Sequence, residues 1–523
     1  MTLAVTNLWR LGRAGFTLAR HGALLPPEQL AQLPAPARGA LRLCQIGTQE
    51  SGDQANRISQ ALSALGPSYI KLGQFLSTRP DVIGAKRAFE LKVLQDRLPP
   101  FATAQAKAIV ASELGKPVEV LFASFGDAVA AASVAQVHKA VTHEGQTVAV
   151  KILRPGVEKR FAADIDSFAF AAQQMERFSA EGRRLRPVAA VDVLAQSMKL
   201  ELDLRMEASA LSEMAKNTKE DPDFRIPAVN WALTSRRVLT TEWIDGTPLA
   251  DVAALRERGL DLPKLAETII QSFLRQAIRD GFFHADMHQG NLMADGEGRL
   301  VALDFGIMGR LSPKDRLFLA EILFGFITRD YLRIAQVHFD AGYVPAHQDV
   351  QNFAQALRAI GEPIMDLPAD QISMARLLTQ LFEVTEQFDM QTQPQLLLLQ
   401  KTMVVVEGVA RTLNPHLNMW TTAEPVVKAW IERALGPVGK LEDAAEAAVS
   451  LGRAALQLPD MLGEAQKATR MLADMASGGG FRLDAATTAA MAKAQAKSRR
   501  WQSLALYAGA TALVVIAAQM VFG

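Results

Sequence analysis

The chain has 523 residues, of which 56 are Lys or Arg, 55 are Asp or Glu and 49% are hydrophobic. A chain of this length can form two or three ordinary domains, or one large domain with extensions. The net charge of +1 provides no global field that favours nucleic acid, so no nucleic-acid partner is expected. Cys44 is the only cysteine, which excludes a disulfide within the chain and a cysteine-based zinc site.

Apolar residues have mainly helical spacing in residues 1–115. At the start, Leu8, Leu11, Phe16 and Leu18 alternate with three arginines, a pattern typical of a basic amphipathic helix. Such a helix fits a membrane surface or an organelle-targeting presequence. It fits equally well an ordinary packed helix with a solvated basic face, and these alternatives stay open.

Short runs typical of β-strands appear between residues 116 and 246, on either side of a helical stretch. The clearest is Thr-Val-Ala-Val-Lys at 147–151, and two further strands are predicted at 228–233 and 237–243. Helical spacing then dominates residues 247–435, apart from the motif-bearing stretch 281–310. Gly-Pro and Gly-Gly-Gly runs within residues 436–500 indicate linkers between Ala-rich helices.

The end of the chain is expected to form a transmembrane tail anchor at residues 501–523. No charged residue occurs from Leu504 to Phe522, a run long enough as a helix to span the roughly 30 Å hydrocarbon core of a bilayer. Arg499 and Arg500 precede this run, which places the body of the protein on the cytoplasmic side. The alternative is a buried terminal helix.

The most specific chemical signal is a pair of motifs, His-Ala-Asp-Met-His-Gln-Gly-Asn at 284–291 and Asp-Phe-Gly at 304–306. Their order and spacing match the catalytic and metal loops of protein kinases. Asp286 occupies the position of the catalytic base. Asn291 and Asp304 supply the hard oxygen ligands that Mg²⁺ prefers, so the motifs predict a magnesium–nucleotide site.

Lys151 supports this interpretation from a distant part of the sequence. It ends the Val-Ala-Val-Lys strand, where a lysine side chain can reach the α- and β-phosphates of ATP. Two other interpretations of the downstream motif are a His/Asp-rich turn without catalysis and a dinuclear metal site formed by His284, Asp286 and His288. The upstream lysine favours the ATP site over both.

With these motifs in place, the sequence resembles the UbiB/ADCK (AarF-like) family of atypical protein-kinase-like proteins, which is linked to ubiquinone biosynthesis. The resemblance extends over residues 68–310. It rests on the His-Ala-Asp-Met-His-Gln-Gly-Asn run and on three further motifs. These are the KxGQ motif Lys71-Leu72-Gly73-Gln74, the Ala-rich loop Ala130-Ala131-Ala132-Ser133-Val134 and the ExD motif Glu201-Leu202-Asp203.

The resemblance implies an α+β, protein-kinase-like fold with two lobes, mainly helical in content. Its expected parts are an N-terminal helical extension that carries the KxGQ motif, a small N-lobe, a helical C-lobe, a helical linker and a transmembrane helix. The corresponding ranges are 1–115, 116–246, 247–435, 436–500 and 501–523.

The resemblance also implies roles for residues around the nucleotide. Lys151 is expected to bind phosphate with Glu201 as its ion-pair partner, while Lys71 and Gln74 reach into the region where a protein kinase binds its peptide. Asp203 and Glu207 are expected to face that second pair. ATP with Mg²⁺ is the expected cofactor, and its contacts are expected from the loop residues Ala130, Ala131, Ala132, Ser133 and Val134 and from the hinge residues Glu242 and Ile244.

Two departures from protein kinases bear on the activity. Alanines replace the glycine-rich loop, and their Cβ atoms restrict how closely the backbone approaches phosphates. After Asp304-Phe305-Gly306 the chain passes almost at once to a helix start at Ser312, without an activation loop or an Ala-Pro-Glu motif. A docking platform for a peptide substrate is therefore missing.

The leading functional hypothesis is an ATPase or small-molecule kinase that supports ubiquinone biosynthesis at a membrane. A true protein kinase and a non-enzymatic, nucleotide-gated scaffold or lipid chaperone are the alternatives. The implied partners are ATP, isoprenoid quinone precursors or other lipids, the membrane and other proteins of ubiquinone biosynthesis. The expected location is the cytoplasmic face of a bacterial inner membrane, with the mitochondrial inner membrane as the alternative.

Overall fold

The computed structural model describes residues 2–23, 54–77, 91, 98–178, 186–365, 380, 383–384, 387–390 and 394–435. The chain divides into two compact units, Met1–Arg433 and Ala434–Gly523. The predicted linker helices at 436–500 and the predicted membrane anchor at 501–523 lie outside the described residues. Within the described parts of the chain, no helix combines the length and the apolar character that crossing a membrane requires.

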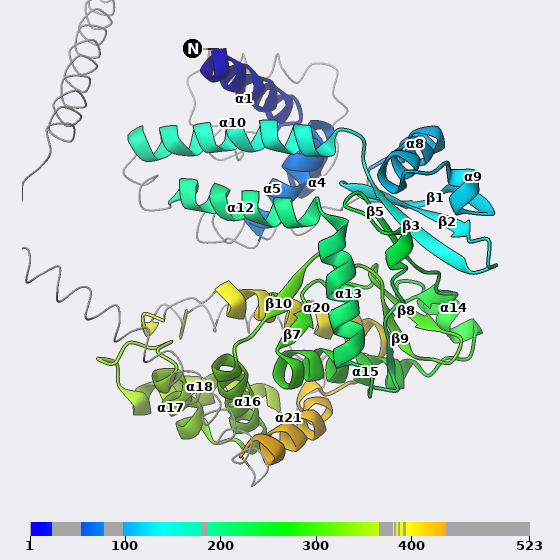
Figure 1. Ribbon diagram of the computed structural model, residues 1–523. Coiled ribbons are helices and arrows are strands. Elements are labelled where there is room, and N and C mark those ends of the chain that lie inside the picture. Colours follow the sequence, from blue (N-terminus) through cyan, green and yellow to red (C-terminus); the bar gives the residue numbers. More distant parts are fainter. Residues whose placement is uncertain are drawn as a thin grey trace, which may run out of the picture. The chain divides into compact units, whose positions relative to one another are not determined.

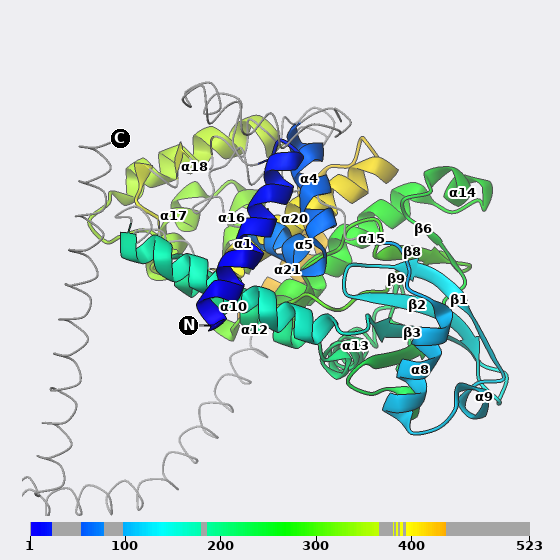
Figure 2. The same cartoon turned by 90° about the horizontal axis from the view of Figure 1, so that it is seen from above.

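A group of stacked helices lies beside the N-lobe sheet (Figures 1 and 2). Two of them, α10 and α12, run side by side, and α1 crosses α10. Gly66, at φ +99°, and Pro67 separate α4 from α5, because only glycine adopts this φ without strain and proline starts a helix readily. The helices are α1 (Thr2–Arg20), α4 (Gln54–Leu65), α5 (Pro67–Ser77), α10 (Val157–Phe178) and α12 (Pro187–Glu201).

The N-lobe contains an antiparallel sheet in the order β1-β2-β3-β5. Val148, Val150 and Ile152 of β3 are buried against α8 and α9, whereas Lys151 lies on the other face because side chains alternate along a strand. The period of β3 thus decides that Lys151 points away from this core. The elements are α8 (Thr103–Leu114), α9 (Val118–Leu121), β1 (Ser124–Ala131), β2 (Ala135–Val141), β3 (Thr147–Leu153) and β5 (Val238–Glu242).

Helix α13 (Leu204–Asn217) follows α12 after a short break. Asp203 caps its N-terminus by accepting a hydrogen bond from the backbone N–H of Arg205. Leu204, Ala208, Leu211 and Met214 are buried at the helical spacing of three to four residues. Glu207 belongs to the same face and is therefore carried into the interior with them.

The C-lobe is mainly helical and contains a four-stranded sheet, in the order β4-β9-β8-β6, and the pair β10-β7. Its strands are β4 (Phe224–Arg225), β6 (Gly246–Pro248), β7 (Phe282–His284), β8 (Leu292–Asp295), β9 (Leu300–Ala302) and β10 (Met308–Arg310). Its helices are α14 (Val252–Glu257), α15 (Leu262–Leu274), the π-helix η2 (Arg275–Asp280), α16 (Pro313–Thr328), α17 (Tyr331–Asp340), α18 (Val350–Met365), α20 (Pro394–Leu413) and α21 (Met419–Leu435). The 3₁₀ turn η1 (Trp231–Leu233) lies against β5 of the N-lobe sheet.

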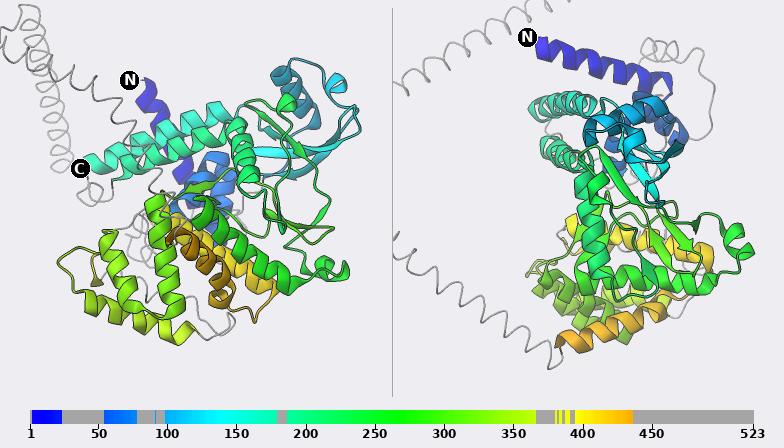
Figure 3. Two further views of the ribbon diagram at one scale, coloured as in Figure 1. Left: turned by 60° about the horizontal axis from the view of Figure 1, so that its bottom comes forward. Right: turned by 45° about the vertical axis from the view of Figure 1, so that its right-hand side comes forward.

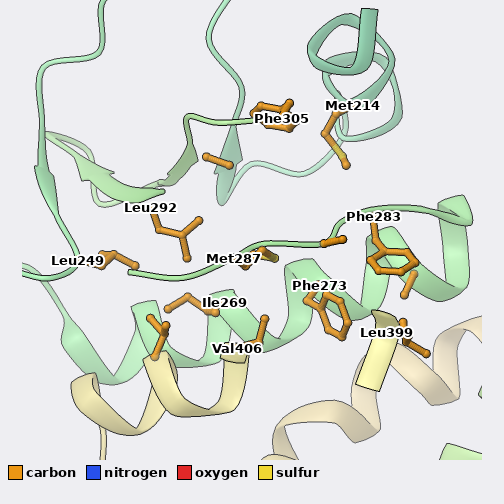
Figure 4. Packing of buried hydrophobic residues seen from close by; sticks show 14 of the residues in the cluster. Met214, Leu249, Ile269, Phe273, Phe283, Met287, Leu292, Phe305, Leu399 and Val406 are labelled. Carbon is orange, nitrogen blue, oxygen red and sulfur yellow. The ribbon is translucent and has the colours of Figure 1, made fainter. Parts of the chain in front are cut away.

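The segment between β7 and β8 runs across the largest buried apolar cluster (Figure 4). Met287 is fully buried in the middle of this segment, close to Ile269 and Phe273 of α15 and to Val406 of α20. Packing of this density restrains the backbone on both sides of Met287, since a core side chain has few alternative positions. The neighbouring polar residues are therefore held in place by the core beneath them.

The structure confirms the mainly helical α+β character, the strand at 147–151 and the helix start at Ser312. Ser312 and Asp315 form a reciprocal capping box at the start of α16. The predicted strand at 228–233 is wrong, because only Val229 forms an isolated bridge before a 3₁₀ turn begins. The side chain of Asn230 accepts a hydrogen bond from the backbone of Leu233 and so favours the turn over a strand.

Candidate active site

Three charged side chains meet where the N-lobe sheet, α13 and the end of β9 come together. The ammonium nitrogen of Lys151 lies 2.7 and 2.9 Å from the two carboxylate oxygens of Glu207. It also lies 3.1 Å from Oδ2 of Asp304. Glu207 is 7% exposed, whereas Asp304 is 44% exposed. One carboxylate therefore anchors the lysine from the interior, and the other is accessible to a ligand.

Attraction between opposite charges outweighs burial at Lys151 and Asp304 but not at Glu207. Burial opposes the ammonium form of Lys151, but the carboxylates of Asp304 and Glu207 outweigh burial and raise the pKa of Lys151. Burial also opposes ionisation of Asp304, yet Lys151 and the backbone N–H of Gly306 hold the pKa of Asp304 below its usual range. Burial, together with the negative charge of Asp304, raises the pKa of Glu207 despite the attraction of Lys151. Asp304 is thus a negatively charged, partly exposed carboxylate beside a stable cation.

The predicted pairing of Lys151 with Glu201 is wrong. Glu201 is the last residue of α12, and its carboxylate lies 2.8 Å from the ammonium of Lys71 instead. The expectation that Asp203 and Glu207 face Lys71 fails for the same reason, because Asp203 caps α13 and pairs with Arg205. Glu201 and Asp203 of the ExD motif lie at the break between α12 and α13, whereas Glu207 lies on the buried face of α13 and contacts Lys151 of β3.

The N-terminal extension still reaches the site through α5. Lys71 and Glu201 are 11% and 13% exposed, so their ion pair is largely removed from solvent. Among several larger influences, the positive charge of Lys71 helps to lower the pKa of Asp304. Gln74 lies almost one turn further along the same helix and is partly buried. The predicted roles of Lys71 and Gln74 stay predictions.

The loop after β7 is ordered by its own hydrogen bonds. The backbone N–H of Asp286 donates to Nδ1 of His284 over 3.1 Å. The amide nitrogen of Asn291 donates to the backbone oxygen of Asp286 over 3.1 Å, which leaves the amide oxygen of Asn291 as a ligand atom. The backbone N–H of Leu303 donates to the backbone oxygen of Asn291, so Asn291 and Asp304 are held near each other. This amide and carboxylate pair fits Mg²⁺, a cation that binds hard oxygen atoms.

His284 is buried beneath this loop and helps to hold its shape. It is fully buried, burial lowers its pKa, and its ring packs against Phe305 with centroids 5.1 Å apart. The side chain of Gln276, in the π-helix η2, accepts a hydrogen bond from the backbone N–H of His284. No group of three acidic, His or Cys residues suited to a metal ion occurs in the described parts of the chain. The alternative of a metal site at His284, Asp286 and His288 is therefore wrong.

The Ala-rich loop forms a tight turn between β1 and β2. The backbone N–H of Ala132 donates to the oxygen of Ala135 over 2.8 Å, while Ser133 and Val134 are buried. The guanidinium of Arg154 donates to the oxygen of Ala132 and to the backbone oxygens of Leu98 and Pro99. Arg154, which the sequence analysis missed, thus ties the Ala-rich loop to the chain that enters the N-lobe. The contacts predicted from Ala130 to Val134 to the nucleotide stay predictions.

The predicted hinge at Glu242 and Ile244 links β5 to the C-lobe. The carboxylate of Glu242 forms a short ion pair with Arg225, and its backbone N–H donates to the oxygen of Ala228 over 2.8 Å. Ile244 is buried. Glu242 therefore ties the end of β5 to Arg225, and an adenine-binding role for the hinge stays a prediction.

Two further residues reach the loop after β7 from α20, and the sequence analysis missed both. The hydroxyl of Thr402 donates to the backbone oxygen of Ala285, 117 positions away, and Lys401 lies near Asp286. A motif shows only residues that are close in sequence. The apolar spacing of α20 predicted a helix there, but it contained no signal for which element the helix contacts.

The chain is similar to known proteins in both lobes. Residues 93–338 match the ABC1 atypical kinase-like domain, and residues 357–418 match the UbiB helical domain. The probable protein kinase UbiB of Marinobacter nauticus is 39% identical, over 99% of this chain and 94% of its own length. The probable protein kinase UbiB of Azotobacter vinelandii is 41% identical, over 75% of this chain and 74% of its own length.

A solved structure shares the fold. It is the complex of Rv3197 with erythromycin from Mycobacterium tuberculosis, which is 25% identical to this chain with a TM-score of 0.50. The similarity covers 75% of this chain and 98% of that chain. The domain match and this likeness confirm the predicted kinase-like fold. Because the family models and the relatives together cover nearly the whole chain, it belongs to the UbiB family of atypical kinase-like proteins, a group of kinase-type enzymes.

Proposed function

We propose that the chain binds ATP with Mg²⁺ through Lys151, Asn291 and Asp304, and turns it over as an ATPase or small-molecule kinase that supports ubiquinone biosynthesis. The observation that carries the proposal is the ammonium of Lys151, held between Glu207 and the accessible Asp304. Phosphoryl transfer depends mainly on positioning and charge neutralisation. A fixed cation beside a carboxylate and an amide oxygen supplies both, with Asp286 at the base position.

Two features favour a small acceptor or water over a protein substrate. After Gly306 the chain forms β10 and reaches the capped start of α16 at Pro313, which leaves a short connection where protein kinases have an activation loop. In addition, the ion pair of Lys71 with Glu201 brings the N-terminal extension to the site. Both features argue against an extended peptide beside Asp286.

The proposal predicts turnover that responds to lipid. The purified full chain should release phosphate from Mg-ATP, and release should increase severalfold when anionic vesicles and a quinone-precursor mimic are added, because both belong to the proposed setting. The measurement is phosphate release with and without each addition. Transfer of radiolabel from ATP to other proteins would favour the protein-kinase alternative, and tight binding without turnover would favour the scaffold alternative.

The first helix supports a membrane setting. Leu8, Trp9 and Phe16 of α1 are 59%, 66% and 54% exposed, while Ala14 and Ala19 are buried. The helix contains three arginines and no acidic residue. In the right panel of Figure 3, α1 lies beyond α10 and α12 at the margin of the coloured ribbon. Exposed aromatic and aliphatic side chains together with arginines suit the interface of an anionic bilayer, so we place the membrane contact on this face.

This assignment predicts a specific loss of binding. In a chain of residues 1–435, which lacks the predicted C-terminal anchor, replacing Leu8 and Trp9 together by Gln should lower the vesicle-bound fraction about tenfold, because two interfacial side chains are lost. Flotation with vesicles that contain anionic lipid measures the bound fraction. Trp231→Gln, at an exposed tryptophan of η1, is the control and should change nothing. Equal binding of both variants would contradict the assignment.

A further inference from the structure

Helix α20, which lies in the region matched to the UbiB helical domain, contacts the catalytic loop directly. The hydroxyl of Thr402, fully buried, lies 3.1 Å from the backbone oxygen of Ala285 and 2.8 Å from that of Leu398. Ala285 immediately precedes Asp286. The position of α20 along its axis is therefore tied to the backbone at the proposed catalytic base.

Lys401, the residue before this tether, brings a cation to the same place. Its ammonium lies 3.8 Å from Oδ1 of Asp286, and the side chains of Lys401 and Asp286 are 36% and 28% exposed. The rest of α20 is fixed in the core, where Val406 and Ala410 are buried. Because the helix cannot shift freely, the ammonium of Lys401 is confined to the surroundings of Asp286 and yet accessible to a ligand.

The catalytic loop itself offers little positive charge. Residues 284–291 contain no Lys or Arg. Lys151 lies between Glu207 and Asp304, on the side of the N-lobe sheet, and the largely buried Lys71 lies 2.8 Å from Glu201. A phosphoryl group in transfer spreads negative charge over three oxygen atoms, and enzymes stabilise that charge with fixed cations. In a kinase-like site the terminal phosphate lies beside the catalytic base, where the described structure places Lys401.

We propose that Lys401 is a catalytic residue of this site, contributed by the helical domain, and that its ammonium binds the γ-phosphate of Mg-ATP beside Asp286. This inference rests on the proposed function. In the reaction, the oxygen of water or of an acceptor hydroxyl forms a bond to the γ-phosphorus and gives its proton to Asp286. ADP leaves with the electron pair of the broken P–O bond. Lys401 stabilises the charge on the transferred group and takes no proton.

The test separates contact with the γ-phosphate from mere support of the loop. Lys401→Met keeps the length and apolar stem of the side chain but removes its charge. In the full chain we expect this variant to weaken Mg-ATP binding about 10- to 100-fold and to leave the Kd for Mg-ADP within about twofold, because ADP lacks the γ-phosphate. Displacement of a fluorescent nucleotide measures both constants. The kcat for phosphate release should fall as well, and Lys401→Arg should restore most of both losses.

Lys428→Met, at an exposed lysine of the neighbouring helix α21, is the matched control and should leave binding and turnover unchanged. Thermal unfolding checks that each variant is folded. A Lys401→Met protein with a lower kcat but an unchanged ratio of Kd values for ATP and ADP would overturn the assignment, since Lys401 would then only support the loop. A wild-type chain that binds neither nucleotide would overturn the proposed function itself.

Discussion

Asp304→Asn is expected to lower Mg-ATP turnover by about 100- to 1000-fold and to remove the Mg²⁺ dependence of nucleotide binding. A metal ion that neutralises phosphoryl oxygens contributes several kcal/mol to a transition state, and each 1.36 kcal/mol is a factor of ten in rate. Asparagine keeps the shape and one oxygen atom but loses the negative charge. The low pKa of the Asp304 carboxyl means that this charge is present throughout the neutral range.

The fold should survive this substitution. Asp304 is 44% exposed, and Lys151 keeps its shorter contacts with Glu207 when the charge of Asp304 is removed. The measurements are phosphate release and a Mg²⁺ titration of nucleotide binding. Glu297→Gln, at an exposed carboxylate in the turn that joins β8 to β9, is the control and should have no effect. An Asp304→Asn protein that binds Mg-ATP as tightly as the wild type would remove Asp304 from the metal site.

The parts of the site that the sequence predicted are those encoded within one short segment. The β-branched run at 147–151 predicts the strand that carries Lys151, and the strict period of two in a strand explains why Lys151 lies opposite Val148, Val150 and Ile152. The motifs around Asp286 and Asp304 are joined by one hairpin, so their spacing in sequence limits their spacing in space. Local geometry, which a single sequence does contain, was sufficient for these predictions.

The ion pairs between elements that are distant in sequence could not be predicted from the sequence alone. Glu201 and Glu207 are both acidic, both lie near the same helix break, and either could have been the partner of Lys151. Only the packing of α13 through Leu204, Ala208 and Leu211 decides that Glu207 is carried inward while Glu201 remains at the end of α12. That decision depends on which face of a helix meets the rest of the protein. A charge pattern shows the face but not what lies opposite it.

Contacts from the helical domain were hidden for the same reason. Thr402 and Lys401 reach the loop around Asp286 across more than a hundred positions of sequence. Spacing predicts that α20 is a helix, and buried residues such as Val406 explain its packing. Neither the spacing nor the burial of these residues indicates that α20 contacts the loop around Asp286. The predicted membrane anchor belongs to a third case, since it lies outside the described residues and stays a prediction.

Glu207→Gln is expected to destabilise the protein and weaken Mg-ATP binding at the same time. Removing one partner of a buried ion pair costs about 3 to 5 kcal/mol, because a buried charge is left without compensation. We expect a cost near the lower limit of this range, since Asp304 still faces Lys151. Without Glu207 the ammonium is drawn towards Asp304, away from the phosphate position, so the Kd for Mg-ATP should rise about tenfold. Denaturant unfolding and nucleotide titration measure the two effects.

Comparison with Glu201→Gln decides between the two possible partners of Lys151. Glu201 contacts Lys71, so its variant should leave the Kd for Mg-ATP much closer to the wild-type value. Glu213→Gln, on the same helix as Glu207 but in an exposed pair with Arg310, should change the free energy of unfolding by less than about 1 kcal/mol. A larger loss of nucleotide binding in Glu201→Gln than in Glu207→Gln would mean that the ExD acid, not the acid in the buried face of α13, holds the phosphate lysine. The contact between Lys151 and Glu207 that the packing of α13 sets would then have to break when ATP binds, and Lys151 would have to move to Glu201.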